Sequence, residues 1–288
     1  RDCNIFLENV SDMSKVGDLT PSMRKRWLAE VKFLKAYYHF RLLEMYGPIP
    51  IVDDRMPQST LPEEFPGRSH FDYVIDYIVN QKLNEETINA LPDVGKADDW
   101  GRATKSAALA LRGRALLYAA SPLWNGKFPY PDWKNTNYET PGYGYELVSR
   151  QEDRGKWDRA LQANLEALRV AESTGERKLV DMDNLPNTMR DVPIPYIAGV
   201  DTSTVEGKEF AKRVLMLRTI TASNEDDGNK ETIWGVFLQD SRAWMTFAQC
   251  PPRIICYNEA NNSWADGWGA INPTLYSVEH FYTKEGKL

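Results

Sequence analysis

The sequence lacks the features that mark several large classes of protein. Its 288 residues include 3 Cys and 3 His, and the histidines lie in unrelated segments, so no metal site is indicated. No apolar run approaches the roughly 20 residues that span a bilayer as a helix. Positive charge is also in deficit, because 35 Lys and Arg stand against 41 Asp and Glu for a net charge of -6. This deficit argues against binding to the nucleic-acid backbone, which requires clustered Lys and Arg.

Motifs for catalysis are missing as well. The chain contains no Gly-x-Ser-x-Gly nucleophile elbow, no phosphate-binding Walker loop and no His-Glu-x-x-His pair. A glycosidase needs two carboxylates about 5 to 9.5 Å apart across one bond. Carboxylates are numerous, but no spacing singles out a pair, and the acidic run 225–227 is typical of a solvated turn. We therefore predict that the protein is not an enzyme and uses no cofactor.

A long aromatic-rich helix is the most clearly marked element that is present. Thr20 before Pro21 is typical of an N-cap followed by proline at the first helical position. Gly47 can close a helix and the prolines after it prevent continuation, so we predict a helix from about Ser22 to Tyr46. Apolar residues recur at helical spacing along one predicted face. They are Trp27, Val31, Leu34, Tyr38, Leu42 and Met45, and the face is widened by Leu28, Phe33, Tyr37, Phe40 and Leu43. We therefore expect this helix to be covered on more than one side.

Further helices are predicted from the same kinds of signal. Ser69 with an acid three residues later resembles a capping box, which would begin a helix that runs to about Ala90. The predicted helix at 101–120 is rich in alanine, and its small residues at helical spacing would let another helix approach it closely. The other predicted elements are helices at 157–171 and 210–220 and a short strand at 232–238.

Several segments resemble one known family. The segment AEVKFLKAYYHFRLLEMYGPIPIV (29–52) resembles the signature helix of the SusD/RagB family of surface glycan-binding lipoproteins. A second block, GRATKSAALALRGRALLYAASPLWN (101–125), resembles the next core helix of that family, including its Ala-Ser-Pro exit. Weaker matches are CNIFLENV (3–10), the Lys-Trp-Asp opening at 156–158 and WGAINPTLYSVEHFYTKEGKL (268–288).

The resemblance implies a mainly α fold. It would be a tetratricopeptide-like scaffold of helix pairs with long irregular loops and a little β structure. We expect one SusD/RagB-like domain over residues 1–288 that is an internal portion of a longer chain. The helical scaffold would occupy about 1–175 and 205–222, and a loop-rich, glycan-facing region about 123–150 and 232–274. The family also suggests that Tyr37 and Tyr38 lie against the alanine-rich helix.

The resemblance also implies a function and partners. A SusD-like protein captures oligosaccharide or polysaccharide at the outer-membrane surface, where an N-terminal lipid upstream of this chain would anchor it. It would deliver the glycan to a SusC-like TonB-dependent transporter and would not cleave it. The partners expected are therefore a glycan, that transporter and the membrane through the lipid anchor, with no nucleic acid.

Candidate ligand-binding residues follow from what sugar recognition requires. A pyranose presents C–H groups to flat aromatic faces and hydroxyls to amides, carboxylates and guanidiniums, all on loops that solvent can reach. The stretch 244–268 supplies this mixture, and 124–145 is a second aromatic cluster of lower rank. The alternative is that these rings fill a loop-rich core, which is the common fate of aromatic residues. The residues we predict to bind ligand are Trp244, Arg253, Tyr257, Asn262, Trp264, Asp266 and Trp133.

Two alternatives remain open from the sequence. Helical-repeat scaffolds also hold peptides, so the rival function is a peptide- or protein-binding subunit of a nutrient importer. A peptide groove would be lined by Asn, Lys and Arg from helices, whereas a glycan site would expose Trp and Tyr on loops. Cys250 and Cys256 are close enough for a local disulfide in an oxidising compartment, while Cys3 is predicted to be a buried thiol.

Overall fold

The computed structural model describes most of the first 235 residues and short segments after them. Described are residues 1–95, 99, 101–130, 132–181, 192–222, 229–235, 255–258, 263–266, 274–276 and 280. The chain divides into two compact units, Arg1–Gly235 and Val236–Leu288, and each is described here by itself. The expectation of one domain over the whole chain stays a prediction.

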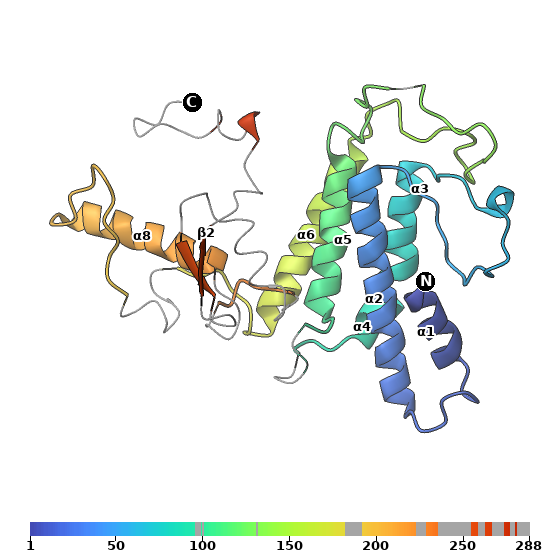
Figure 1. Ribbon diagram of the computed structural model, residues 1–288, viewed down its shortest axis with the longest axis horizontal. Coiled ribbons are helices and arrows are strands. Elements are labelled where there is room, and N and C mark those ends of the chain that lie inside the picture. Colours follow the sequence, from blue (N-terminus) through green and yellow to red (C-terminus); the bar gives the residue numbers. More distant parts are fainter. Residues whose placement is uncertain are drawn as a thin grey trace. The chain divides into compact units, whose positions relative to one another are not determined.

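The first unit is built from helices, which confirms the predicted mainly α fold (Figure 1). Four helical stretches pack together and alternate in direction along the chain: α2, α3 with η2, α5 and α6, with α2 drawn between α3 and α5 in Figure 1. No helix in the described part of the chain is long and apolar enough to cross a membrane. The elements of this unit are α1 (Asp2–Ser11), α2 (Pro21–Tyr46), η1 (Pro62–Glu64), α3 (Phe71–Asp76), η2 (Tyr77–Lys82), α4 (Glu85–Ala90), α5 (Lys105–Ala120), α6 (Gly155–Ser173) and α8 (Val205–Ala222).

Helix α2 begins and ends where the sequence predicts. The Thr20 hydroxyl accepts a hydrogen bond from the Met23 N–H at 3.3 Å, which satisfies one of the free amides of the first turn. Gly47 closes the helix at φ +66° with its N–H bonded to the Leu43 carbonyl at 2.9 Å. This end of α2 lies against Trp124 and Trp133 of the loop that connects α5 to α6.

The predicted apolar face of α2 is partly correct, because Phe33, Phe40 and Leu43 are buried, and it is wrong at Tyr38, Leu42 and Met45. Tyr38 is 53% exposed and Met45 is 67% exposed. Apolar residues occupy most of the circumference of this helix, so their spacing alone does not identify the face that is covered. The buried face consists of Ala29, Phe33, Ala36, Phe40 and Leu43.

The helix predicted from the capping box to Ala90 is in fact three elements. The residue that caps α3 is His70, whose Nδ1 accepts from the Asp72 N–H at 3.1 Å. The chain then widens into one π-helical stretch, η2, in which the Leu83 N–H bonds to the Ile78 carbonyl five residues earlier at 3.0 Å. Asn84 caps the separate helix α4 by accepting from the Thr87 N–H at 2.9 Å.

Helices α5 and α6 form the closest helix pair of the unit. Gly113 of α5 lies so near Asn164 of α6 that a Cβ at Gly113 would come within 2.7 Å of Asn164 Oδ1. Asn164 donates from Nδ2 to the Gly113 carbonyl at 3.1 Å. The alanine-rich helix therefore packs chiefly on α6. The expected contact with Tyr38 is wrong, and the ring that α2 presents to α5 is Phe40, which meets Tyr118 at 5.8 Å.

Residues 229–235 return to the helical unit without forming a strand over 232–235, contrary to the prediction for that segment. Trp234 packs edge-on against Phe33 at 5.2 Å and Tyr37 at 5.0 Å between ring centroids. Its indole Nε1–H donates to the Gly101 carbonyl at 2.8 Å. This one side chain ties the end of the unit to α2.

In the second unit the structure describes a two-stranded antiparallel hairpin of β1 (Ile255–Asn258) and β2 (Ser263–Asp266).

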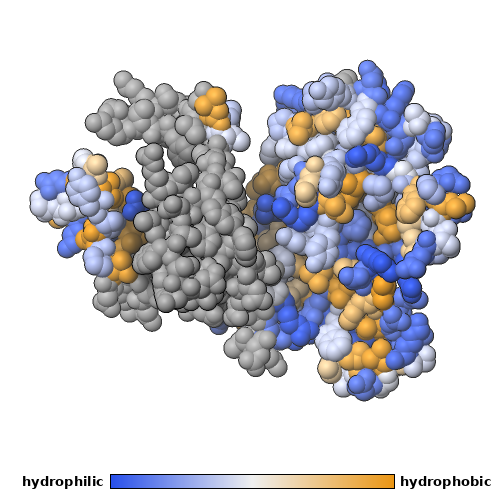
Figure 2. Space-filling view, in the orientation of Figure 1, coloured by the Kyte–Doolittle hydropathy of each residue, from blue (hydrophilic) through white to orange (hydrophobic). Residues whose placement is uncertain are grey.

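On the face of the molecule drawn in Figure 2, apolar residues of the first unit lie in small groups between hydrophilic ones. Exposure of apolar residues by itself therefore does not mark a binding surface. A site has to be identified from shape and chemistry.

Candidate functional site

The long connection between α5 and α6 is an ordered loop whose two ends are joined by one buried amide. The Asn125 side chain is 1% exposed. Its Oδ1 accepts from the Asp153 N–H at 2.8 Å, and its Nδ2 donates to the Asp153 carbonyl at 3.0 Å. Next to it, Gly126 has φ +87° and lies where a Cβ would be 2.6 Å from the Glu152 nitrogen. The loop therefore leaves and returns at one fixed point.

The same loop is attached along its length to the segment that precedes α3. Asn135 Nδ2 donates to the Arg68 carbonyl at 2.7 Å, and the His70 N–H donates to the Thr140 hydroxyl at 2.9 Å. These bonds satisfy buried backbone groups that would otherwise lack partners. A loop fixed in this way can hold side chains in defined positions at the surface.

A row of stacked rings connects the core to this loop. Phe71 of α3 stacks on Trp124 at 4.2 Å with an interplanar angle of 7°. Trp124 stacks on Phe128 at 5.2 Å and Phe128 on Trp133 at 5.5 Å, with angles of 21° and 19°. Trp124 is only 6% exposed and belongs to the core, whereas Trp133 is half-buried. The row therefore begins in the core and ends at the surface.

The outer end of this row lines a hollow of about 590 Å³, which we call the aromatic hollow. Tyr130, which is 71% exposed, meets Phe128 edge-on at 6.0 Å. The Asp132 side chain is 91% exposed. The hollow is lined by Phe128, Pro129, Tyr130, Asp132 and Trp133.

The C-terminal end of α2 at Gly47 packs against two rings of the aromatic row, Trp124 and Trp133. A Cβ at Gly47 would lie 2.9 Å from Trp124 and 3.7 Å from Trp133, so both rings use the space that glycine leaves. Arg68 donates to the Tyr46 and Pro48 carbonyls at 3.0 and 2.6 Å. Its guanidinium also lies over the Trp133 ring at 5.5 Å, a cation–π contact that holds the ring.

This arrangement suits a ligand with both apolar faces and hydroxyls. Flat rings held by stacking lose little conformational freedom when a ligand covers them. The Asp132 carboxylate can accept hydrogen bonds from ligand hydroxyls. The hollow has no buried acid–base pair and no group of residues suited to bind a metal among the described residues. Its lining residues can offer a ligand aromatic stacking and hydrogen bonds.

The structure brings some of the predicted ligand-binding residues together. Trp133 lines the aromatic hollow in the first unit. In the hairpin of the second unit, Tyr257 pairs directly with Trp264 and Ile255 with Asp266. Directly opposite positions of an antiparallel pair share a face, so Tyr257, Trp264 and Asp266 belong to one face of the ribbon.

The other predicted positions are not tested by the structure. Trp244, Arg253 and Asn262 lie outside the described residues, as does Cys250 of the predicted disulfide. Cys256 is in β1, and Cys3 is partly exposed instead of fully buried.

Sequence reasoning missed Phe128, Pro129 and Asp132, which complete the aromatic hollow around Trp133. A usable signal was present. The run KFPYPDW at 127–133 alternates aromatic rings with prolines, and prolines restrict the backbone between rings to extended or turn conformations. Such a run cannot continue either adjacent helix, so it presents its rings on a loop.

Comparisons with known proteins agree on one family. Residues 1–117 match the family model SusD-like_3, described as "Starch-binding associating with outer membrane". The solved structure of BT4246 is 43% identical to this chain with a TM-score of 0.78, and the match covers 99% of this chain and 46% of BT4246.

A more distant solved structure has the same fold. The SusD-like protein BF3747 from Bacteroides fragilis NCTC 9343 is 21% identical with a TM-score of 0.56, over 100% of this chain and 40% of that protein. The chain thus spans less than half the length of these two relatives. No curated protein matches it.

Proposed function

Because the chain belongs to the SusD-like family, we propose that it binds oligosaccharide or polysaccharide at the outer-membrane surface and does not cleave it. The observation that carries the proposal is the row of stacked rings from Phe71 to Trp133, which ends at a solvent-facing hollow. The exposed Tyr130 lies on a loop, as expected for a glycan site.

The proposal includes the partners that the family implies. The protein is a surface lipoprotein that passes its glycan to a SusC-like TonB-dependent transporter. The description of the matched family, starch binding in association with the outer membrane, supports this setting. The predicted residues of the hairpin, Tyr257, Trp264 and Asp266, contribute a second aromatic surface, together with Trp244, Arg253 and Asn262.

Titration calorimetry with neutral plant, host and microbial oligosaccharides tests the proposal. We expect saturable binding by one glycan class, weakened about tenfold by Trp133→Ala because the ligand loses a stacking face. Tyr130→Ala should also weaken binding and leave the fold intact, since Tyr130 is 71% exposed. Trp157→Ala is the matched control, because Trp157 is an exposed tryptophan of α6 outside the hollow.

Two results would contradict the proposal. Equal loss of affinity in Trp133→Ala and Trp157→Ala would mean that the aromatic hollow is not the site. New reducing ends appearing when the protein is incubated with a bound glycan would show hydrolysis and overturn the non-catalytic reading.

A further inference from the structure

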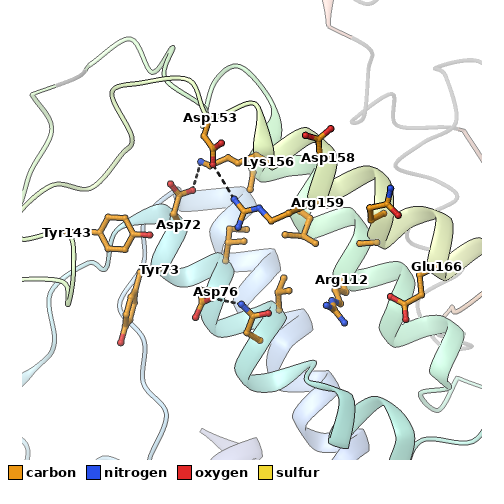
Figure 3. Close-up of a pocket in the computed structure, with 17 residues that line it drawn as sticks. Asp72, Tyr73, Asp76, Arg112, Tyr143, Asp153, Lys156, Asp158, Arg159 and Glu166 are labelled. Atoms are coloured by element: carbon orange, nitrogen blue, oxygen red, sulfur yellow. Dashed lines mark hydrogen bonds and ion pairs between the residues drawn. The ribbon is translucent and has the colours of Figure 1, made fainter.

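A second cavity lies on the helical bundle, and neither the family resemblance nor the proposed function assigns it a role. It is a groove of about 920 Å³ between α3 with η2 on one side and α6 on the other, with α5 beneath. Figure 3 shows Asp72 and Asp76 from α3, Arg112 from α5 and Asp158 and Glu166 from α6 around it. We call it the helical groove.

The floor of the helical groove is aliphatic. It lies where the three helical stretches meet, and most of its side chains are buried or half-buried. Aromatic rings are confined to Tyr73 and Tyr143 at one end, as Figure 3 shows. The residues of the floor are Ile75, Val79, Leu116, Ala119 and Ala163.

The two basic residues at the inner end of the groove are already paired. Lys156, whose side chain is 8% exposed, lies 2.6 Å from Asp72, and Asp72 also accepts from the Ser149 hydroxyl at 2.5 Å. Arg159 lies 3.4 Å from Asp153. Lys156 of α6 is therefore paired across the groove with Asp72 of α3, and Arg159 is paired with Asp153 in an exposed ion pair.

The rim keeps three carboxylates that are not neutralised. Among the described residues, Asp76, Asp158 and Glu166 form no ion pair. Asp76 accepts from the Asn80 side chain at 2.5 Å, which satisfies one oxygen without removing the charge. Asp76 acts on a neighbouring ring as well: burial first, and then the charges of Asp72 and Asp76, raise the pKa of Tyr143.

Arg112 is the one basic side chain of the lining that has no ion pair among the described residues. Its Nε is buried and has no hydrogen-bond partner. Arg112 is one of the lining residues, and Figure 3 shows its side chain beside Glu166 at one end of the groove. An arginine in this position can donate to ligand carbonyls or to a carboxylate.

The local backbone also departs from regular helix at this place. Val79 and Asn80 of the groove belong to η2. Stretches of π-helix are rare, and they are found frequently at functional sites. Here the wider turn lies directly at one wall of the helical groove.

An aliphatic floor beneath an acidic rim does not suit a sugar, which stacks on aromatic faces. It suits an apolar side chain flanked by positive charges, with donors such as Asn80 and Arg112 for main-chain carbonyls. We propose that the helical groove binds a short cationic peptide, independently of glycan capture in the aromatic hollow. An apolar side chain of the peptide lies on the floor, and its Lys or Arg residues face Asp76, Asp158 and Glu166. A volume of about 920 Å³ is at the upper end of small-ligand sites, which indicates a peptide of a few residues.

Titration calorimetry of the whole protein with two blocked pentapeptides tests this inference. One alternates Lys and Leu, and the other replaces each Lys with Glu. We expect saturable binding of the Lys peptide only, weakened by added salt. The triple variant Asp76→Asn, Asp158→Asn and Glu166→Gln should weaken that binding about tenfold. Glu172→Gln is the matched control, an exposed carboxylate of α6 outside the groove.

The outcomes separate this inference from the sugar proposal. Trp133→Ala should leave the affinity for the Lys peptide unchanged, whether or not any glycan binds. Equal binding of the Glu peptide, or an unchanged dissociation constant in the triple variant, would overturn the peptide site. Displacement of the Lys peptide by an oligosaccharide would overturn it too, because the groove would then be a sugar site.

Discussion

At the scale of single residues, the carboxylate of Asp53 joins α2 to η2 by binding Lys35 of α2 and Lys82 and Tyr77 of η2. Asp53 Oδ1 lies 2.5 Å from Lys35 Nζ and 2.7 Å from Lys82 Nζ, and it accepts from the Tyr77 hydroxyl at 2.7 Å. Burial alone raises the pKa of Asp53, but these three donors outweigh it and hold the pKa far below the ordinary value of 3.8. Burial lowers the pKa of Lys35, whose side chain is 3% exposed.

The first prediction follows from the direction of that shift. Because the folded protein lowers the pKa of Asp53, its contribution to stability is complete above the ordinary pKa of 3.8 and is lost as the pH falls below that value. We expect Asp53→Asn to reduce the free energy of unfolding by about 1–2 kcal/mol at pH 7, since Lys35 then has no carboxylate. Urea unfolding at pH 7, 5 and 3 measures the difference. It should shrink toward pH 3, and parallel pH profiles would contradict this account.

At the scale of elements, Gly47 joins the end of α2 to the aromatic row. Its φ of +66° and ψ of -138° are accessible to glycine and rarely to other residues. Gly47→Ala adds backbone strain and a Cβ 2.9 Å from the Trp124 ring. We expect a loss of about 2–4 kcal/mol of unfolding free energy in urea titrations, together with weaker glycan binding because Trp133 is displaced.

Gly175, just after α6, is the matched control for that variant. It also has a positive φ, +72°, but nothing lies within 4 Å of a Cβ built there. Gly175→Ala should therefore lower the free energy of unfolding by about 1 kcal/mol. Equal effects of the two substitutions would mean that the contact between Gly47 and Trp124 has no energetic role.

Element boundaries were predictable where a local chemical signal fixes them. Thr20, Pro21 and Gly47 determine the ends of α2, and the predicted helix from about Ser22 to Tyr46 agrees with Pro21–Tyr46. Which helix covers which depends on contacts distant in sequence. The exposure of Tyr38, Leu42 and Met45 on α2 and the packing of α5 on α6 were therefore not predicted. In particular, Gly113 opposite Asn164 is visible only when both helices are in place.

At the scale of the whole molecule, the family could be identified from two sequence blocks because their helices and exits are specific. The resemblance to SusD-like proteins is confirmed by the match of residues 1–117 to the family model SusD-like_3. The site was harder to predict. Trp133 was predicted to bind ligand, but the aromatic hollow also depends on Trp124, Phe128 and Gly47, which meet only after the loop folds back on α3. The acids of the helical groove come from two helices that are distant in sequence, Asp76 from α3 and Asp158 and Glu166 from α6.

The last prediction is that the first unit, which ends at Gly235, folds by itself. Trp234 belongs to the first unit, where it contacts Phe33 and Tyr37 and donates to the Gly101 carbonyl. A chain that ends at Gly235 keeps this contact, the aromatic hollow and the helical groove. We expect it to unfold cooperatively in urea with the affinity for the Lys peptide preserved.

The comparison variant is Trp234→Ala in the chain that ends at Gly235, which removes the indole that contacts α2. Trp234→Ala should lower the free energy of unfolding by about 2–4 kcal/mol, because a half-buried ring and its hydrogen bond are lost. Circular dichroism and urea titration of the two shortened proteins measure the difference. If the chain ending at Gly235 fails to fold while the full chain is stable, residues 236–288 are part of the same cooperative unit, as the single-domain prediction requires. If it folds and binds the Lys peptide, the helical unit is sufficient for that site. Any glycan affinity lost on truncation then measures the contribution of residues 236–288, which include Tyr257, Trp264 and Asp266.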